Sequence, residues 1–360
     1  METVRTAAPA WARGGGSLLR GVAARLHLDK AADFWLGELD ATWSLGGRRA
    51  RVERVIDETR DVKTFVLAPH GAWPTHRAGQ HVAVEVEVNG VRTRRCYSLS
   101  SAPSDPRPAI TVKRVAGGRV SEWMHRSLRP GAVVGLGDPA GDFTLHEPTP
   151  AKVLLLSGGS VATPVMSMLR ELAARDALRD VVYAHCARSR DDVIFAAELD
   201  ALAARHPGLR VALHLGGVLD EAALDAMAPD LAERETFLCG PAGMMAVVEG
   251  VWEVRGASSR LRRERFTAPR AVAGGAKARL HLAVSGRAVD AEAGVTLLES
   301  LERAGERPAY GCRMGICNTC RCRKRSGTVV DAVTGAVSSE PDEDIRLCVS
   351  VAQTDLELAL

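Results

Sequence analysis

The sequence lacks any apolar run that approaches the about 20 residues needed to span a bilayer, so no transmembrane helix is expected. It also lacks a marked charge of one sign, because 47 Lys and Arg against 44 Asp and Glu leave a formal net charge of +3. This balance gives no reason to expect a nucleic acid as a partner. No secretory leader is recognisable, which together with unpaired cysteines favours a cytoplasmic protein.

Cysteine is scarce, with eight in 360 residues, yet four of these follow a specific spacing: Cys312-x4-Cys317-x2-Cys320, and Cys348 after a long gap. Plant-type ferredoxins use this spacing to hold a 2Fe–2S cluster with four thiolates. A zinc site is disfavoured because only one short Cys-x-x-Cys pair is present. A disulfide framework is typical of small secreted chains and is disfavoured by the length. We therefore expect these four cysteines to be iron ligands.

The chain is too long for one hydrophobic core and is expected to be multi-domain. Short alternating strands between Arg51 and Phe143 predict a small antiparallel β-barrel. From Lys152 the pattern changes to strands that alternate with helices, which is typical of an α/β domain with a parallel sheet. The expected boundaries are an N-terminal extension (1–46), the barrel (47–149), the α/β domain (150–268), a flexible linker (269–277) and an α+β ferredoxin domain (278–360), whose resemblance implies a β-grasp fold.

The barrel region contains Arg95-Cys96-Tyr97-Ser98 and, downstream, Gly118-Arg119-Val120-Ser121 before an amphipathic helix. With these motifs in this order, the chain resembles the ferredoxin–NADP reductase superfamily, whose flavin-binding elements are R-x-Y-S and G-x-x-S. A guanidinium suits a phosphate, and helix N-terminal amides favour a pyrophosphate. The resemblance implies that Arg95 binds phosphate, Tyr97 packs on the ring or ribose, Ser98 contacts the flavin N5, and Gly118, Val120 and Ser121 hold the pyrophosphate. It favours FAD, although related reductases with the same domain order use FMN.

The α/β domain opens with a strand that runs into Gly158-Gly159 and then Thr163-Pro164. A Gly-rich turn between a strand and a helix predicts a dinucleotide phosphate cradle, here in the superfamily's G-G-x-x-x-T-P form. A second element, Cys239-Gly240-Pro241, resembles the segment that positions nicotinamide against the flavin. Cys239 is expected near the reacting carbon, where hydride transfer needs positioning rather than an acid or a base.

Nucleotide preference is expected to depend on the turn after the second strand of this domain. Arg188 and Arg190 occupy the place where a 2′-phosphate would be read, and no acidic residue ends the strand. We therefore favour NADPH, with NADH as the alternative; a solvated basic turn would look the same. Phe266 closes the domain and is expected either to shield the flavin or to pack into the core.

The order of flavin, nucleotide and cluster domains implies a reductase that accepts a hydride and releases single electrons to a protein partner. The run before the barrel is similar to reductases that serve acyl-CoA desaturases, so a desaturase is the preferred acceptor. A Rieske-type or haem monooxygenase partner, with NADH and FMN, is the alternative. A redox-sensing regulator without turnover, or a barrel that binds no flavin, would fit the motifs less well.

Two further surfaces are expected to matter. A helix within residues 17–28 with one apolar face predicts either peripheral membrane association or packing on the barrel, with 34–36 as the anchor. Basic residues lie in and beside the loop 311–320, which we call the cysteine loop. This basic collar could steer an acidic electron acceptor, dock onto the protein's own barrel domain, or simply be exposed to solvent. The collar consists of Arg313, Arg321, Arg323, Lys324 and Arg325.

Overall fold

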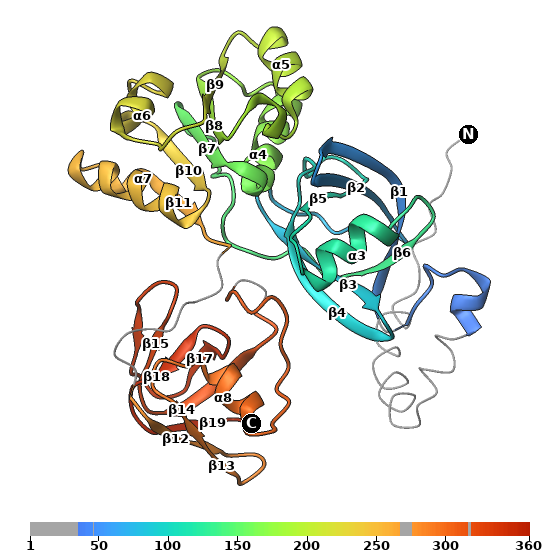
Figure 1. Cartoon of the computed structure of the whole chain (residues 1–360), viewed down its shortest axis with the longest axis vertical. Coiled ribbons are helices and arrows are strands. Elements are labelled where there is room, and N and C mark those ends of the chain that lie inside the picture. Colours follow the sequence, from blue (N-terminus) through green and yellow to red (C-terminus); the bar gives the residue numbers. More distant parts are fainter. Residues whose placement is uncertain (1–34, 46, 267–275, 316–317) are drawn as a thin grey trace, which may run out of the picture.

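The computed structural model describes residues 35–45, 47–266, 276–315 and 318–360, which form three lobes (Figure 1). We name them the barrel domain (β1–β6), the sheet domain (β7–β11) and the C-terminal domain (β12–β19). Within the described ranges, no helix is both long enough and apolar enough to cross a membrane. The expected interfacial helix at 17–28 and most of the linker lie outside these ranges.

The barrel domain is a six-stranded antiparallel sheet in the order β4-β3-β6-β1-β2-β5. A bridge between Leu99 and Ile110 brings its two edges together. Apolar and polar side chains alternate along its strands, and the apolar ones form the core. The four valines of β3 point inward and are buried, whereas the glutamates between them are not buried. Its elements are β1 (Arg48–Thr59), β2 (Val62–Pro69), β3 (His81–Val88), β4 (Val91–Ser98), β5 (Ala109–Lys113), α3 (Arg119–Ser127) and β6 (Val133–Leu136).

The sheet domain is a five-stranded parallel sheet in the order β11-β10-β7-β8-β9. Its central strand β7 is buried along its whole length, because helices cover both faces. Leu155 packs on the face covered by α4 and α5, and Leu154 on the face covered by α6 and α7. The elements are β7 (Val153–Gly158), α4 (Thr163–Ala174), β8 (Val181–Ala187), α5 (Ala196–Arg205), β9 (Leu209–Leu215), α6 (Glu221–Met227), β10 (Glu235–Cys239), α7 (Ala242–Val254) and β11 (Leu261–Glu264).

The C-terminal domain has a five-stranded mixed sheet in the order β13-β12-β19-β14-β17, and α8 packs on it. Strands β12 and β19 are parallel, and the other pairs are antiparallel. A small sheet of β16, β15 and β18 lies beside it. The elements are β12 (Ala278–Leu282), β13 (Ala288–Ala291), α8 (Leu297–Arg303), β14 (Arg321–Ser326), β15 (Val329–Asp331), β16 (Val337–Ser338), β17 (Glu343–Arg346), β18 (Ser350–Ala352) and β19 (Leu356–Leu358).

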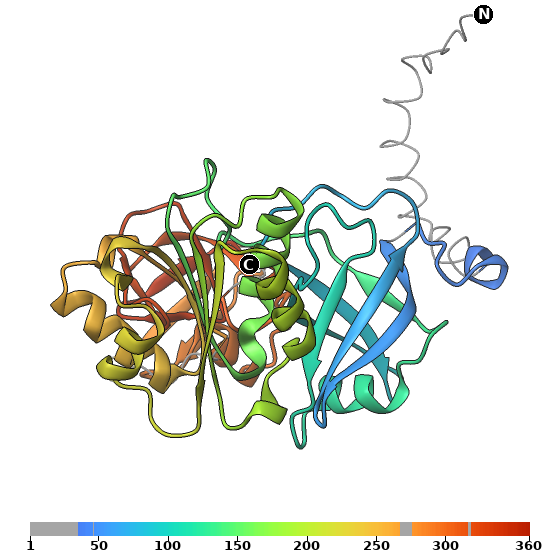
Figure 2. The ribbon, with the colours of Figure 1, turned by 90° about the horizontal axis from the view of Figure 1, so that it is seen from above.

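The barrel and sheet domains lie side by side (Figures 1 and 2) and are joined by hydrogen bonds from the region of α4 and α5. Ser167 Oγ donates to the Ser101 carbonyl at 2.7 Å, and the Arg170 guanidinium donates to the carbonyl of Ser100. The amide of Phe195 donates to Glu58 Oε2 at 3.3 Å. These bonds fix the relative position of the two domains.

The segment before the barrel packs on it through Trp43, whose ring lies 5.9 Å from that of His70. Asp40 also pairs with Arg51 at 3.0 Å. The expected anchor at 34–36 differs from this arrangement: Phe34 is outside the described residues, and Trp35 is 68% exposed.

Candidate functional site

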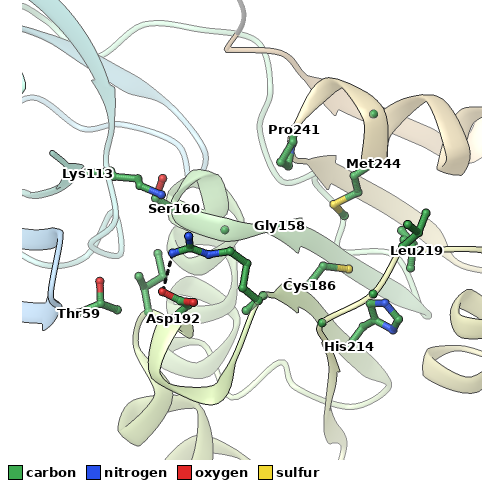
Figure 3. A pocket seen from close by; sticks show the side chains of 18 of the residues that line it. Thr59, Lys113, Gly158, Ser160, Cys186, Asp192, His214, Leu219, Pro241 and Met244 are labelled. Carbon is green, nitrogen blue, oxygen red and sulfur yellow. Dashed lines mark hydrogen bonds and ion pairs between the residues drawn. The ribbon is translucent and has the colours of Figure 1, made fainter. Parts of the chain in front are cut away.

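A cavity of about 710 Å3 lies at the carboxyl ends of β7, β8 and β9; we call it the sheet cavity (Figure 3). Open α/β sheets bind their ligands at this edge, where successive strand ends leave a crevice. Gly158 and Gly159 form one part of its wall, and Pro241 and Met244 form another. The two motifs that the sequence separates by some 80 positions thus meet at one cavity.

The glycine turn is shaped for close approach. Gly159 has a φ of +60°, which favours glycine, and a Cβ on Gly158 would lie only 2.5 Å from Met244 Sδ. A Cβ on Gly240 would come within 2.7 Å of the same sulfur, although Gly240 itself does not line the sheet cavity. These glycines let the C-G-P segment pack directly against the phosphate-cradle turn.

Only one of the two predicted nucleotide-reading arginines reaches the sheet cavity. Arg188 lines it and pairs with Asp192 at 2.8 Å, and this hydrogen bond lowers the pKa of Asp192. Arg190 does not line it: the short 3-10 turn Arg190–Asp192 directs this side chain to α5, where it pairs with Asp200 at 2.5 Å. Of the two arginines predicted to read the nucleotide, the structure thus brings only Arg188 to this cavity.

The barrel domain contributes residues to the sheet cavity that the sequence did not point to. Thr59 and Lys113 line it from the side opposite to Met244 and Leu219 (Figure 3). Asp61 also lines it, and Lys113 Nζ lies 3.6 Å from Asp61 Oδ2. Lys113 ends β5 and pairs in register with Val62. No sequence spacing indicates this contact, because it depends on how two domains meet.

A second cavity of about 390 Å3, the barrel cavity, collects the predicted flavin residues. Ser98 Oγ is buried there without a hydrogen-bond partner. Helix α3 starts at Arg119 with no side-chain cap, so its first amide groups are available to an anion. A Cβ on Gly118 would lie 2.6 Å from Ser121 Oγ. The lining includes Arg95, Tyr97, Ser98, Gly118, Val120 and Ser121, all six as expected.

These features fit a flavin nucleotide. An aromatic ring and apolar walls suit the ring system, whereas the uncapped helix and a guanidinium suit its phosphate. The unpartnered hydroxyl of Ser98 is left for a polar atom of the ligand.

Residues of the other two domains complete the barrel cavity. Ser160 lines both cavities, and Thr163 lines the barrel cavity rather than the sheet cavity where it was expected. Phe266 and Met314 also line the barrel cavity. Pro164 is buried in the first turn of α4 and lines neither cavity.

Cys239 lines neither the sheet cavity nor the barrel cavity but lies beneath their walls. It is fully buried and donates through Sγ to the carbonyl of Val161 at 2.9 Å, and Val161 lines the barrel cavity. Burial raises the pKa of Cys239 well above its ordinary value, with a smaller contribution from Glu264. Cys239 therefore supports the cavity wall as a neutral thiol.

A third cavity of about 360 Å3, the junction cavity, is lined by all three domains. His81 and Phe143 contribute from the barrel side, Glu264 from β11, and Asp331 and Arg346 from the C-terminal domain. Burial raises the pKa of Glu264 to about 8.

Three of the four predicted iron ligands converge. Cys312, Cys320 and Cys348 are buried, and Cys348 lies within hydrogen-bonding reach of the other two thiols. The hydrogen bond with Cys348 lowers the pKa of Cys320, whereas hydrogen bonds with Cys312 and Cys320 raise the pKa of Cys348. Cys317 lies outside the described residues. Thiols gathered on one tight loop and one returning segment fit a 2Fe–2S cluster.

The expected basic collar is not an unpaired basic surface. Lys324 is fully buried and donates to the carbonyls of Gly327 and Glu340 at 2.8 and 2.6 Å. The four arginines pair with carboxylates of their own domain: Arg313 with Glu302, Arg321 with Asp344, Arg323 with Asp342 and Asp344, and Arg325 with Glu357.

The three domains match three known families. Residues 49–145 match the oxidoreductase FAD-binding domain, residues 155–250 the oxidoreductase NAD-binding domain, and residues 280–353 the 2Fe-2S iron-sulfur cluster binding domain. The predicted order of domains and cofactor types is confirmed.

Whole-length relatives share this order. The chain is similar to a Mycobacterium tuberculosis protein named NADPH oxidoreductase, with 38% identity over 96% of this chain and 92% of the relative. It is 33% identical to the glycine betaine monooxygenase reductase subunit of Chromohalobacter salexigens, over 88% of this chain and 96% of the relative. The solved structure of phthalate dioxygenase reductase superposes with a TM-score of 0.61 at 26% identity, covering 87% of this chain and 97% of that chain.

Proposed function

Because the chain belongs to the oxidoreductase family that joins an FAD-binding, an NAD-binding and a 2Fe–2S domain in one polypeptide, we propose that it carries electrons from NADPH to an oxygenase or desaturase partner. One observation supports this most directly. Residues of all three domains, including Ser98, Ser160 and Met314, line the single barrel cavity. A hydride donor, a flavin and a one-electron carrier can therefore meet there.

The barrel cavity would hold FAD. Arg95 and the amide groups at the start of α3 bind the pyrophosphate, and Gly118 allows its close approach. Tyr97 packs against the ligand, and the Ser98 hydroxyl bonds to the ring edge. When bound, FAD supplies the exchange between a two-electron hydride and single electrons.

The sheet cavity would hold the nicotinamide nucleotide. Gly158 and Gly159 admit the pyrophosphate, and Lys113 adds positive charge from the barrel side. Arg188 lines the same cavity, and its guanidinium would pair with a 2′-phosphate, which supports NADPH. The name of the M. tuberculosis relative agrees with this preference.

Nucleotide preference is tested by specificity constants for NADPH and NADH with an artificial acceptor. We expect NADPH to be preferred. A strong preference for NADH would overturn the role of Arg188 but leave the rest of the proposal intact.

Hydride transfer needs neither an acid nor a base. The residues between the sheet cavity and the barrel cavity therefore position the reactants and exclude water. Neutral Cys239 keeps the Val161 backbone in place. Phe266 and Ser160 line the barrel cavity. Cys312, Cys317, Cys320 and Cys348 would hold the 2Fe–2S cluster as thiolates.

We propose an acyl-CoA desaturase as the acceptor, on the resemblance of residues 33–47 to desaturase-serving reductases; the C. salexigens relative supports an oxygenase instead. Reconstitution of the purified protein with NADPH and each acceptor class separates the two. Turnover with an oxygenase component and none with a desaturase would reject the desaturase. Failure to reduce cytochrome c with NADPH would instead favour a redox sensor without turnover.

A further inference from the structure

Met314 lies where the cysteine loop meets the flavin side of the molecule. It is half-buried, between Cys312 and Gly315, and it lines both the barrel cavity and the junction cavity. Among the described residues of the C-terminal domain, no other lines the barrel cavity. One side chain of the C-terminal domain therefore reaches the cavity that is predicted to hold the flavin.

The position of Met314 is coupled to that of the cysteines. Its amide donates to Cys312 Sγ at 3.3 Å. The next carbonyl, that of Gly315, accepts a hydrogen bond from Arg346, which pairs with Asp331 at 2.9 Å. Any shift of the cysteine loop would move Met314 with it.

Gly315 fixes the loop from the other side. Its φ of +77° favours glycine, and a Cβ there would lie 2.7 Å from Val349, the neighbour of Cys348. At Gly315 the backbone has little room to rearrange, and this restrains the neighbouring Met314 at the barrel cavity.

Ion pairs between the described residues do not account for the seating of this domain. Every ion pair of its described residues is internal. The junction cavity beside Met314 is lined by charged residues of different domains, such as Glu264, Asp331 and Arg346. An apolar contact at the barrel cavity is what the loop itself offers.

A thioether suits this place. Methionine is unbranched and polarizable, fills irregular gaps and packs well against aromatic rings. It does not titrate, and it excludes water from the space between two redox groups. An electron passing there meets no group that must gain or lose a proton.

We propose that Met314 is the positioning residue that seats the cluster loop against the flavin, at the contact where electrons leave the flavin one at a time. The inference rests on the proposed function. Each NADPH delivers one hydride, hence two electrons; the cluster accepts one electron at a time, so two transfers pass this contact. The protein acceptor takes both electrons, and the flavin protons return to solvent.

The test compares Met314→Ala and Met314→Leu with Val333→Ala, which trims an apolar side chain that lines the junction cavity but not the barrel cavity. Loaded proteins are mixed anaerobically with NADPH, and flavin and cluster absorbance are followed separately. Fluorescence of the oxidised flavin provides a second readout, because it rises when the cluster loop withdraws. The EPR spectrum of the dithionite-reduced cluster checks that the cluster is intact.

We expect Met314→Ala to reduce its flavin at the wild-type rate but to slow cluster reduction at least about tenfold, with higher flavin fluorescence, because small misplacements have large effects on transfer rates. Met314→Leu should recover most of the rate, and Val333→Ala should match wild type. Unchanged cluster reduction in Met314→Ala, or equal loss in Val333→Ala, would overturn the inference. If wild type itself bleached the flavin but never the cluster, the proposed function would fail instead.

Discussion

Ser98 is the residue whose chemistry is best isolated by the fold, since its buried hydroxyl has no partner in the barrel cavity. We predict that Ser98→Ala slows hydride transfer from NADPH to the flavin about tenfold, the effect of one lost hydrogen bond of about 1.4 kcal/mol. FAD content should stay near wild type, because the phosphate contacts remain. Rapid-mixing absorbance and released-flavin analysis measure both quantities.

Ser300→Ala is the matched control, because Ser300 is also buried with an unpartnered hydroxyl but lies in α8 of the C-terminal domain. It should leave flavin reduction unchanged. Equal slowing in both variants would show that the effect of Ser98 is not local.

Arg188 and Arg190 form a second pair for testing at this scale, two positions apart but directed to different places. Arg188→Gln should raise the KM for NADPH about tenfold or more, because a charge-assisted hydrogen bond is worth about 1.5–3 kcal/mol, with little change for NADH. Arg190→Gln should change neither. Loss of NADPH preference in Arg190→Gln alone would contradict the assignment.

Where a motif is local, the sequence predicted which side chains lie at one cavity. The R-x-Y-S motif lies on one strand and the G-x-x-S motif at one helix start, so local structure alone decides which side chains share a cavity. Arg190, Lys113 and Met314 depend on how turns and domains pack. Their positions in the sequence do not predict that packing.

Among the secondary structure elements, alternation and apolar runs predicted the antiparallel strands of the barrel and the strand–helix alternation of the sheet domain. Strand β11 was missed, because its four residues, LRRE, contain one apolar side chain and show no periodicity. It is an edge strand held by pairing with β10. Backbone pairing of this kind leaves a weak pattern in side chains.

Helix α4 holds the sheet domain to the barrel through Arg170, whose guanidinium bonds the Ser100 carbonyl, pairs with Glu198 and stacks on Phe195. We predict that Arg170→Met slows hydride transfer several-fold while FAD content stays constant, because the two cavities lose their alignment. The rate of flavin reduction at saturating NADPH measures this.

Arg255→Met is the control for this variant, since its ion pairs with Glu221 and Asp225 stay within the sheet domain. It should leave the rate unchanged. A rate in Arg170→Met that equals wild type would mean that the other interdomain bonds suffice.

Strand β11 ends in Glu264, opposite Cys239, and its burial raises the pKa to about 8 from 4.5. Folding therefore takes up a proton between these pH values, and the free energy of unfolding falls as the pH rises through this window, by up to about 1.4 kcal/mol per unit. Glu264→Gln removes this term. The melting temperature of this variant, relative to that of wild type, should therefore increase from pH 6 to pH 8.

Glu253→Gln, which alters an exposed carboxylate of α7, should show no comparable gain. If the melting temperatures of wild type and Glu264→Gln changed equally between pH 6 and pH 8, Glu264 would already be ionised in the folded protein.

Across the whole protein, three domains meet around the barrel and junction cavities: the C-terminal domain has a core of its own, whereas Val62 and Ala78 of the barrel domain belong to the main core of the sheet domain. The sequence predicted the domains and their order, because each carries its own periodicity and motif. The meeting of the three domains could not be read from it, since the residues that touch are contributed by segments far apart. The basic collar illustrates the limit: its partners Asp344 and Glu357 come from strands that return much later.

The central claim is that a hydride entering at the sheet cavity leaves as single electrons through the cluster. Anaerobic stopped-flow mixing of the loaded protein with NADPH, with Cys348→Ser as the variant that lacks a cluster ligand, tests it most directly. We expect the flavin absorbance to bleach first and the cluster absorbance to follow within one turnover. Cys348→Ser should show only the flavin phase. A cluster that stays oxidised in wild type while the flavin is fully reduced would contradict it.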